Sequence, residues 1–324
     1  MLSRRVLISG LAGVVLMGLD AGPGVAQSYP ARPITLIVPF AAGGFNDVIV
    51  RIVTQHMSKT LGVSIIVEND AGAGGTTATA RGAAAPADGY TLIAGSMGTH
   101  GAAPTQYPNL KYDPAKDFTP IGLTAEAPAV LVTRKDFPAN TLAEFIDYLK
   151  KNATKVNEAH AGVGSQMHTY CTLLQSILGT KTARIAYRGG APAINDLVAG
   201  QVDFGCVSIN TVVSQIQGGT VKALAIASPN RAEVIRDVPT TVEAGLPEFQ
   251  VSGWNAIFAP RNLPRDIQAK LSDALTSALE DPATAKRLQE IGCFIPNRAD
   301  RTPAALQGRV EHDVARWSTV LKRE

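Results

Sequence analysis

Apolar runs alternate along the chain with stretches in which apolar residues recur at helical spacing. The run over 34–38 is typical of a buried parallel strand, and the residues after it predict a helix over 47–61. Further strands are predicted near 64–67 and 90–94, with a helix over about 76–85 between them. This strand–helix–strand–helix–strand order favours a parallel sheet with helices on both faces.

The second half of the chain repeats this alternation after a connector over 104–120 that is rich in Pro, Tyr and Asp. Strands are predicted near 129–133, 156–159, 184–186, 202–206 and 222–225, and helices over 142–149, 166–178, 193–198 and 211–216. Residues 251–259 are expected to be extended, and amphipathic helices are expected over 264–279, 282–291 and 303–321. The whole pattern predicts an α/β protein.

A glycine-rich turn joins the first predicted strand to the first predicted helix. It contains Gly43 and Gly44, and Asn46 is positioned to cap a helix that begins near it. The free backbone N–H groups at a helix start carry roughly half a positive charge. The turn is therefore a candidate anion site that needs no Lys or Arg. An ordinary turn, in which the glycines only permit a tight path, would show the same residues.

Three later turns repeat this arrangement of strand, glycine turn and helix, at 69–76, 161–168 and 187–192. The second of them carries Ser165 as a predicted helix cap and His168 in the first helical turn. The turn at 69–76 resembles a dinucleotide-binding fingerprint, but a threonine stands where the third glycine belongs. A nucleotide site is therefore disfavoured.

The third predicted strand ends in Ala94-Gly95-Ser96-Met97-Gly98, which nearly matches the G-x-S-x-G motif of serine hydrolases. With His100 or His168 as base, Ser96 could serve as the nucleophile of an exported hydrolase. No acidic residue stands out as the third member of a triad, and the residues after Ser96 do not resemble a helix. The hydroxyls of Ser96 and Thr99 equally suit ligand binding at the carboxyl end of a strand.

The composition of the 324 residues disfavours several classes of function. A formal net charge of +3 without a basic run argues against a nucleic-acid partner. Cys171, Cys206 and Cys293 are widely spaced and have no companion histidines, so neither a metal site nor a cofactor is expected. One disulfide is compatible with an oxidising compartment, but three buried thiols are favoured because each cysteine stands beside apolar residues.

Residues 1–26 have the features of a cleavable signal peptide. Two arginines precede an apolar stretch over 6–19, and small residues lie just before residue 27. The apolar stretch is shorter than the roughly 20 residues that span a membrane. The mature protein is therefore expected in the periplasm, exported by the general secretion route rather than the twin-arginine route.

Seven short motifs are distributed over essentially the whole mature chain. They are Tyr29-Pro30-x-Arg32-Pro33-Ile34, Pro39-Phe40-x-x-Gly43-Gly44-x-x-Asp47, Val67-Glu68-Asn69-x-x-Gly72-Ala73-Gly74-Gly75, Pro86-x-Asp88-Gly89-Tyr90-Thr91-Leu92, Tyr112-Asp113-Pro114-x-x-Asp117-Phe118, Tyr187-x-Gly189-Gly190-Ala191-Pro192-Ala193 and Gly200-Gln201-Val202-Asp203. On these motifs the chain resembles the Bug family of periplasmic solute-binding proteins, which serve tripartite tricarboxylate transporters.

The resemblance implies a two-domain α/β Venus flytrap, each domain a mixed, largely parallel sheet flanked by helices. It implies a first domain over 27–125 and 251–324 and a second domain over 126–250. It also implies a carboxylate in the cleft, held largely by backbone amides, and the membrane subunits of a transporter as partners. The protein is expected to be a monomer and not an enzyme, although a hydrolase or a ligand-binding sensor partner remains an alternative.

Two carboxylate subsites on opposing lobes are predicted. The first is assigned to the backbone of Gly43, Gly44, Phe45, Asn46 and Asp47, with Gly75, Thr76, Ser96 and Thr99 in support; the second is assigned to Ser165, His168, Ser208 and Asn210. Asp47 is expected to cap its helix rather than touch a carboxylate, and His168 is expected to pair with one as a cation. Arg188 is the main basic candidate near the cleft, unless its turn lies at the hinge.

Two departures from the family pattern bear on the ligand. Phe45 stands where small or hydroxyl residues are common, and it offers a flat apolar wall. Val207 stands where many members have an acidic residue, which removes a partner for an ammonium group. The expected ligand is a dicarboxylate; an aromatic one of terephthalate type is favoured, with aliphatic diacids close behind.

Overall fold

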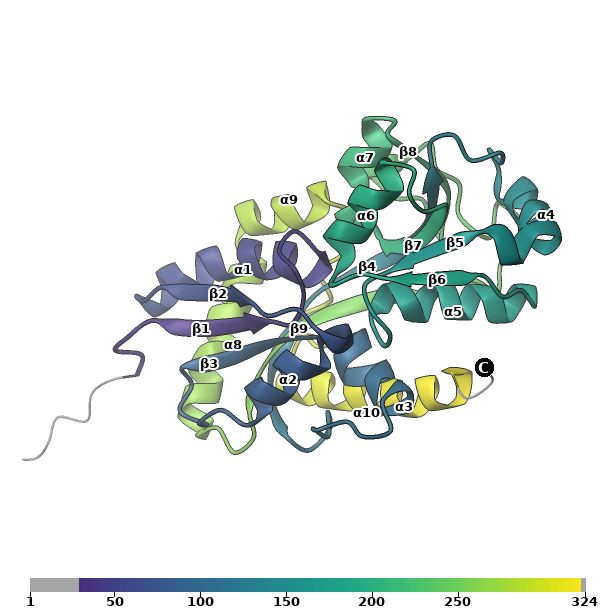
Figure 1. Ribbon diagram of the computed structural model, residues 1–324. Helices are drawn as coiled ribbons and strands as arrows, with labels where there is room; N and C mark the ends of the chain where they lie inside the picture. Colours follow the sequence, from purple (N-terminus) through teal and green to yellow (C-terminus); the bar gives the residue numbers. More distant parts are fainter. Residues whose placement is uncertain (1–28, 322–324) are drawn as a thin grey trace, which may run out of the picture.

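One long strand joins the two lobes in the computed structural model, which describes residues 29–321. The first half of β4 (Phe118–Arg134) pairs with β9 (Ser252–Pro260), and its second half pairs with β7 (Phe204–Ser208) and β8 (Val221–Ile226). The change of partners falls after Pro128. Figure 1 shows β4 and β9 passing between the lobes. The predicted signal peptide, 1–26, lies outside the described residues.

The first lobe is built on the sheet order β2-β1-β3-β9-β4. In it β1 (Ile34–Val38) runs parallel to both β2 (Ile65–Asn69) and β3 (Thr91–Ser96), whereas β9 is antiparallel to β3 and β4. The helices of this lobe are α1 (Phe45–Leu61), α2 (Thr76–Ala83), α3 (Ala103–Gln106), α8 (Arg265–Glu280), α9 (Pro282–Glu290) and α10 (Pro303–Leu321).

The second lobe combines parallel and antiparallel pairings in the same way. Its strand β5 (Asn157–His160) runs parallel to β6 (Ala183–Ala186) and β7, and β4 is antiparallel to β7 and β8. The helices are α4 (Leu142–Asn152), α5 (Gln166–Leu178), α6 (Gly190–Val198) and α7 (Val213–Gln217). Both lobes are therefore mixed α/β units, as predicted. Among residues 29–321, no helix is long and apolar enough to cross a membrane.

Helix α1 illustrates how local sequence sets these elements. Ile49, Val53 and Met57 recur every fourth residue and are all fully buried against the sheet. The helix ends where Gly62 adopts a left-handed conformation at φ +73°, and its N–H bonds to the Ser58 carbonyl at 3.0 Å. A side chain at this position would be strained, so the glycine defines the end of the helix.

The sequence pattern missed two elements. The first half of β4 falls partly in the predicted connector, because Pro120, Gly122 and Pro128 are rare inside central strands. The structure tolerates Pro120 and Gly122 through register shifts in the pairing with β9. The residues after Ser96 were expected to be non-helical, but Met97–Ala102 form a π-helical turn that continues into α3.

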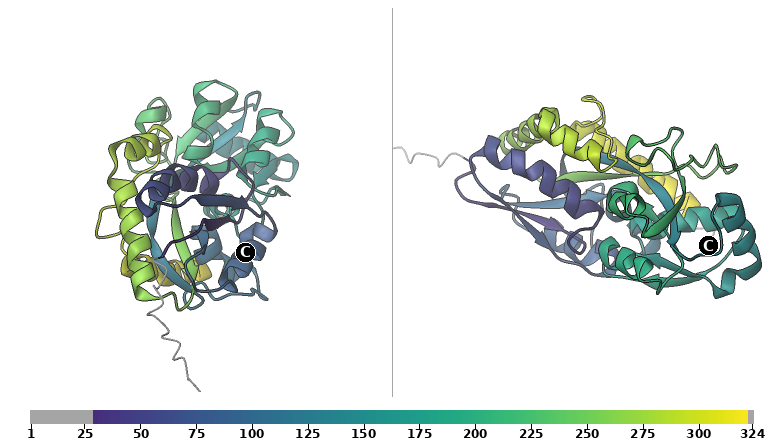
Figure 2. Two further views of the ribbon diagram at one scale, coloured as in Figure 1. Left: turned by 90° about the vertical axis from the view of Figure 1, so that its left-hand side faces the viewer. Right: turned by 90° about the horizontal axis from the view of Figure 1, so that it is seen from above.

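The apolar core is not divided at the boundary between the lobes. One buried cluster combines Leu36 of the first lobe with Met167 and Val207 of the second. The other combines Trp254 and Trp317 with buried aromatic residues of the second lobe. In Figure 1, α10 runs beneath both lobes, and it packs against both β4 and α5. The lobes lie end to end in Figure 1 and in the right-hand view of Figure 2.

Cys171 and Cys206 form a disulfide that joins α5 to β7, with 5.3 Å between their Cα atoms. The interpretation of three buried thiols is therefore wrong for this pair and correct for Cys293, which is free and buried. The pairing depends on the packing of α5 against β7, which the spacing of the cysteines does not reveal. Burial raises the pKa of the Cys293 thiol to about 12, so this thiol is unreactive in the folded protein.

We expect reduction of the Cys171–Cys206 disulfide to lower the free energy of unfolding by about 2–4 kcal/mol, because the cross-link restricts the unfolded chain. Urea unfolding of the oxidised and reduced protein measures this difference. The oxidised, unfolded chain should contain one reactive thiol, which the control Cys293→Ala removes. Equal unfolding free energies with and without reductant would contradict the expectation.

Candidate functional site

A cavity lies between the two lobes. It is lined from the first lobe by Phe40, Gly44, Phe45 and Asn46, and from the second lobe by Ala161, Ser165, Gln166, Met167, Gly190, Ser208 and Thr211. None of these side chains carries a charge. Gly44, Phe45, Asn46, Ser165 and Ser208 belong to the predicted set, so the structure brings members of both predicted subsites to one cavity.

Three helices of the described chain begin at this cavity. They are α1 after Gly44, α5 after Ser165 and α6 after Gly189. The first amides of a helix have no acceptor within it, and each helix start attracts negative charge. A Cβ on Gly44 would lie 3.7 Å from the Gly190 nitrogen, so the starts of α1 and α6 face each other across the cleft. Together they form an anion-binding environment made from backbone.

The start of α6 was noticed in the sequence as a glycine turn but was not assigned to the site. The missing information is spatial, because only the packing of the lobes brings Gly190 opposite Gly44. The predicted cap at Asn46 is wrong: Gly44 is the cap residue, and Asn46 is the second residue of α1. The Asn46 side-chain amide is buried and lies 3.5 Å from the Ala94 carbonyl oxygen.

Asp47 holds the turn before α1 in place. Its carboxylate accepts hydrogen bonds from the Gly43 amide, the Arg51 guanidinium and the Asn69 amide, each at 2.9 Å. Asn69 also donates to the Phe40 carbonyl at 3.0 Å, so the strand end and the turn share one polar cluster. Asp47 therefore holds the residue before the cap rather than capping α1, so the predicted capping role is not confirmed. The Gly43 amide is engaged by Asp47 rather than offered to the cavity.

The electrostatics of Asp47 follow from these bonds. Burial by itself raises the pKa of the carboxyl group, but hydrogen bonds from Arg51, Gly43 and Asn69 outweigh burial and hold the pKa below its ordinary value of 3.8. Asp47 is therefore a carboxylate at neutral pH. Its charge stabilises the turn from the side away from the cavity.

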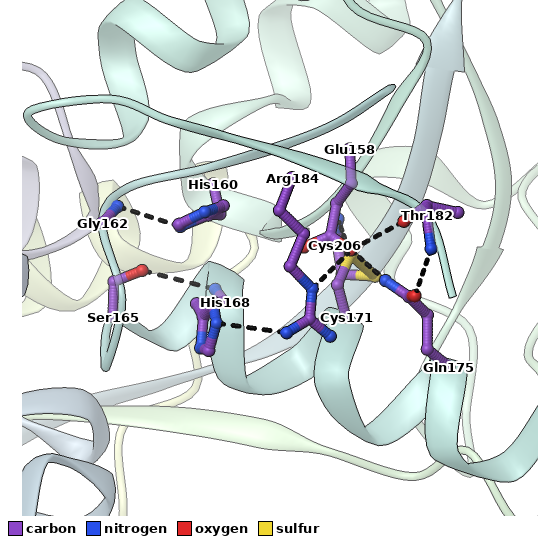
Figure 3. Close-up of polar contacts among 10 residues, drawn as sticks. All are labelled: Glu158, His160, Gly162, Ser165, His168, Cys171, Gln175, Thr182, Arg184 and Cys206. Carbon is purple, nitrogen blue, oxygen red and sulfur yellow. Dashed lines mark hydrogen bonds and ion pairs between the residues drawn. A yellow bond between two sulfur atoms is a disulfide. The ribbon is translucent and has the colours of Figure 1, made fainter. Parts of the chain in front are cut away.

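The second predicted subsite is only partly at the cavity. Ser165 caps α5 by accepting a hydrogen bond from the His168 amide at 3.3 Å. The His168 ring lies away from the cavity lining, next to the His160 ring and with its Nε2 3.4 Å from Arg184 Nη1 (Figure 3). Burial, and then the neighbouring His160 and Arg184, lower the pKa of His168 to about 3. A His168 cation facing the ligand does not fit this position.

Ser96 and Thr99 cap the helical turn that follows β3 rather than lining the cavity. The Ser96 amide donates to Thr99 Oγ1 at 3.1 Å, and Thr99 Oγ1 lies 2.9 Å from His100 Nδ1. Within residues 29–321, the side-chain hydrogen bonds of Ser96 are to Thr99. The His100 ring is fully buried and stacked on Phe258 at 4.1 Å. This arrangement gives Ser96 no histidine base, so it does not support the hydrolase alternative.

The remaining predicted residues lie outside the cavity lining. Asn210 donates from its side-chain amide to the Phe45 carbonyl across the cleft at 3.3 Å. Gly75 lines an outer groove, which shares Phe40 and Ala161 with the cavity. Thr76 faces a separate surface hollow, and its hydroxyl donates to the Ala73 carbonyl at 2.8 Å. Within the described chain, no group of His, Cys, Asp and Glu side chains could hold a metal ion.

Arg188 lies at the outer groove and not at the hinge. Its side chain is exposed, and no carboxylate of the residues that the structure describes pairs with it. Three hydrogen bonds between the lobes cross this groove. The Ala41 amide donates to the Arg188 carbonyl at 3.2 Å, and the Tyr107 hydroxyl donates to the Val163 carbonyl at 2.7 Å. The Gly164 amide donates to Gln106 Oε1 at 3.1 Å. An unpaired cation therefore stands beside the approach to a cavity without charged side chains.

Comparison with known proteins places this architecture among solute receptors. The family model described as "Tripartite tricarboxylate transporter family receptor" matches residues 49–323. MatC (Rpa3494) from Rhodopseudomonas palustris, solved with bound malate, is 44% identical, with a TM-score of 0.88 over 90% of this chain and 99% of MatC. The periplasmic binding protein BugD is 39% identical, with a TM-score of 0.87 over 91% of this chain and 98% of BugD.

A further relative of known structure carries a different ligand. Rpa4515 from R. palustris, solved with adipate, is 31% identical, with a TM-score of 0.86 over 91% of this chain and 97% of that protein. Structures of this kind therefore hold ligands of different chain length.

We expect Asp47→Ala to lower the free energy of unfolding at neutral pH by about 1.5–3 kcal/mol, the range for hydrogen bonds to a charged group. Because the pKa of Asp47 is lowered in the folded protein, its contribution is complete above pH 3.8 and is lost as pH falls through the folded value. Urea unfolding near neutrality and in acid should show a difference that shrinks in acid. Asp237→Ala, at an exposed site, is the control and should change stability by less than about 0.5 kcal/mol.

Proposed function

Because the chain belongs to the tripartite tricarboxylate transporter receptor family, we propose that it captures a dicarboxylate between its lobes and delivers it to the membrane subunits of such a transporter. The match to the family and the likeness to BugD confirm the expected Bug-family membership and the two-domain periplasmic binding-protein fold. The observation that carries the proposal is the convergence of three helix starts, from both lobes, on one cavity without charged side chains.

A ligand with two anionic ends suits this arrangement. The start of α1 belongs to the first lobe, and the starts of α5 and α6 belong to the second. A dicarboxylate can accept hydrogen bonds from both lobes at once, and such contacts exist only when the lobes are together. A third carboxylate would find no cation among the lining residues, and an unpaired buried charge is strongly unfavourable. A tricarboxylate is therefore disfavoured.

The central part of the ligand would pack on aromatic walls. Phe40 and Phe45 both line the cavity, and Phe45 is half-buried. The malate of MatC and the adipate of Rpa4515 are aliphatic, which supports an aliphatic dicarboxylate for this chain. Terephthalate remains the aromatic candidate, because stacking on Phe45 adds about 0.5–1.5 kcal/mol beyond area burial. Val207 is buried in the core, so it offers no group to an ammonium.

The proposal also covers location and organisation. The signal peptide 1–26 would direct the chain to the periplasm, and the protein would act as a monomer that binds without turnover. The proposed domain limits at 125/126 and 250/251 lie close to the points where β4 changes partners and β9 begins. An ester panel provides the check against the hydrolase alternative, which predicts turnover that Ser96→Ala abolishes. Following uptake and chemotaxis in a deletion strain separates a transport receptor from a sensor partner.

Calorimetric titration should detect specific binding of a dicarboxylate when malate, succinate, adipate and terephthalate are compared with benzoate. A bound ligand at a hundred times its Kd should raise the free energy of unfolding by about 2.7 kcal/mol. Phe45→Leu should weaken terephthalate more than malate, because only the aromatic ligand loses a ring contact. Binding of benzoate as tight as that of every diacid would argue against two anionic subsites.

Arg188→Gln should slow the association of a dicarboxylate at low ionic strength and leave its dissociation rate unchanged. The reason is that an exposed cation at the mouth of the cleft attracts a dianion over a distance that salt shortens. Stopped-flow measurements at low and high salt separate the two rates. The control Lys181→Gln removes an exposed cation that does not line the groove, and it should have little effect. An effect confined to dissociation would instead make Arg188 a direct ligand contact.

A further inference from the structure

A histidine side chain holds the turn that leads into α5 by a hydrogen bond on the side away from the cavity. His160 is the last residue of β5 and is 2% exposed. Its Nδ1 accepts a hydrogen bond from the Gly162 amide at 3.2 Å (Figure 3). Two residues of this turn, Ala161 and Ser165, line the cavity. The hydrogen bond therefore lies directly behind the backbone that forms the second lobe's part of the site.

The turn needs the hydrogen bond to His160 because its backbone conformation is unusual. Gly162 has φ +101° and Gly164 has φ +76°, conformations that only glycine adopts without strain. The turn has one bond of its own, from the Ser165 amide to the Gly162 carbonyl at 3.1 Å. The Gly162 amide has its acceptor in the His160 ring, and without that acceptor it would be a buried, unpaired donor.

A ring nitrogen accepts a hydrogen bond only when it carries no proton. The contact with Gly162 therefore requires a neutral His160 with its proton on Nε2. A proton on Nδ1 would place two donors face to face, and the turn would have to move. The geometry makes the position of the turn sensitive to the charge of one imidazole.

Charged and titratable groups surround His160 on several elements. From α5 comes the His168 ring, 4.9 Å away, and from β6 comes Arg184, whose cation lies next to His168 and forms an ion pair with Glu158 of β5 at 3.6 Å. On the remaining neighbours, Asp196 of α6 accepts the Tyr187 hydroxyl, and Cys206 of β7 is held in the disulfide. Burial is the largest influence and lowers the pKa of His160 below 6.5, and the Arg184 cation acts in the same direction.

We propose that His160 is a positioning residue for ligand binding, which holds the turn 161–165 through Gly162 and releases it when the ring gains a proton. The proposal rests on the proposed function, since it concerns the same cavity. Its consequence is that the receptor keeps its ligand near neutral pH and loses affinity in acid. This sign is the same as that of ligand protonation, so the experiment must separate the two causes.

Two variants of His160 separate the effect of His160 protonation from the effect of ligand protonation. In His160→Asn, the side-chain oxygen lies where Nδ1 was, so an acceptor that does not titrate replaces the imidazole. In His160→Leu, the Gly162 amide has no acceptor. Near neutral pH, we expect the Asn variant to bind malate within about threefold of the natural protein, and the Leu variant to bind about tenfold more weakly, as for a buried amide that loses its partner.

The decisive readout is the pH profile of the malate Kd from about pH 7.5 to about pH 4.5, across the range in which histidine titrates. Ligand protonation affects both proteins equally, so the natural protein should lose about tenfold more affinity than His160→Asn over this range. Parallel profiles would overturn the proposal. His312→Gln, at an exposed position outside the cavity lining, is the matched control and should not alter the profile.

A measurement without ligand tests the role of His160 independently of the proposed function. The Gly162 amide resonance in an NMR titration should move with pH in the natural protein and stay fixed in His160→Asn. If it moves as expected but no dicarboxylate binds, the proposed function fails and the positioning role stands. If a dicarboxylate binds but the Gly162 resonance is insensitive to pH, the positioning role fails alone. The Asn comparison suffices if His160→Leu does not fold.

Discussion

Backbone N–H groups at the start of a helix have no acceptor within that helix. The rest of this structure depends on bringing several such groups together at one place. The starts of α1, α5 and α6 meet at the cavity between the lobes. Each start contributes positive potential without a mobile, hydrated side chain. Because the amides belong to rigid helices, their directions are fixed before a ligand arrives, which lowers the entropy that binding has to overcome.

Three polar side chains near the site hold the turns that lead into these helices. Asp47 holds Gly43 before α1, Ser165 holds the first turn of α5, and His160 holds Gly162. Each side chain satisfies an amide that the cavity does not use, and so fixes which amides remain available. A charged or titratable residue can therefore influence an anion site by holding the backbone that forms the site, without contacting the anion.

The sequence predicted the architecture and half of the site for clear physical reasons. Apolar periodicity and glycine turns are local signals, and they correctly indicated the starts of α1 and α5 and the capping role of Ser165. The sequence pattern carries no information on which groups of the two lobes face each other across the cleft. His168 was chosen because it follows a cap, yet its ring lies with His160 and Arg184; Gly190 was not assigned, yet it faces Gly44. The Cys171–Cys206 bond and the first half of β4 likewise depend on packing between distant segments.

The apolar clusters that cross from one lobe to the other give the receptor a dependence on temperature. Both clusters contain residues of the two lobes, and β4 runs through their junction. Separating the lobes exposes some of this apolar surface to water, so opening has a positive heat capacity change, as unfolding does. Hydrophobic association weakens on cooling. In the proposed receptor, the balance between open and closed lobes would therefore shift toward opening in the cold, independently of how tightly the amides would hold an anion.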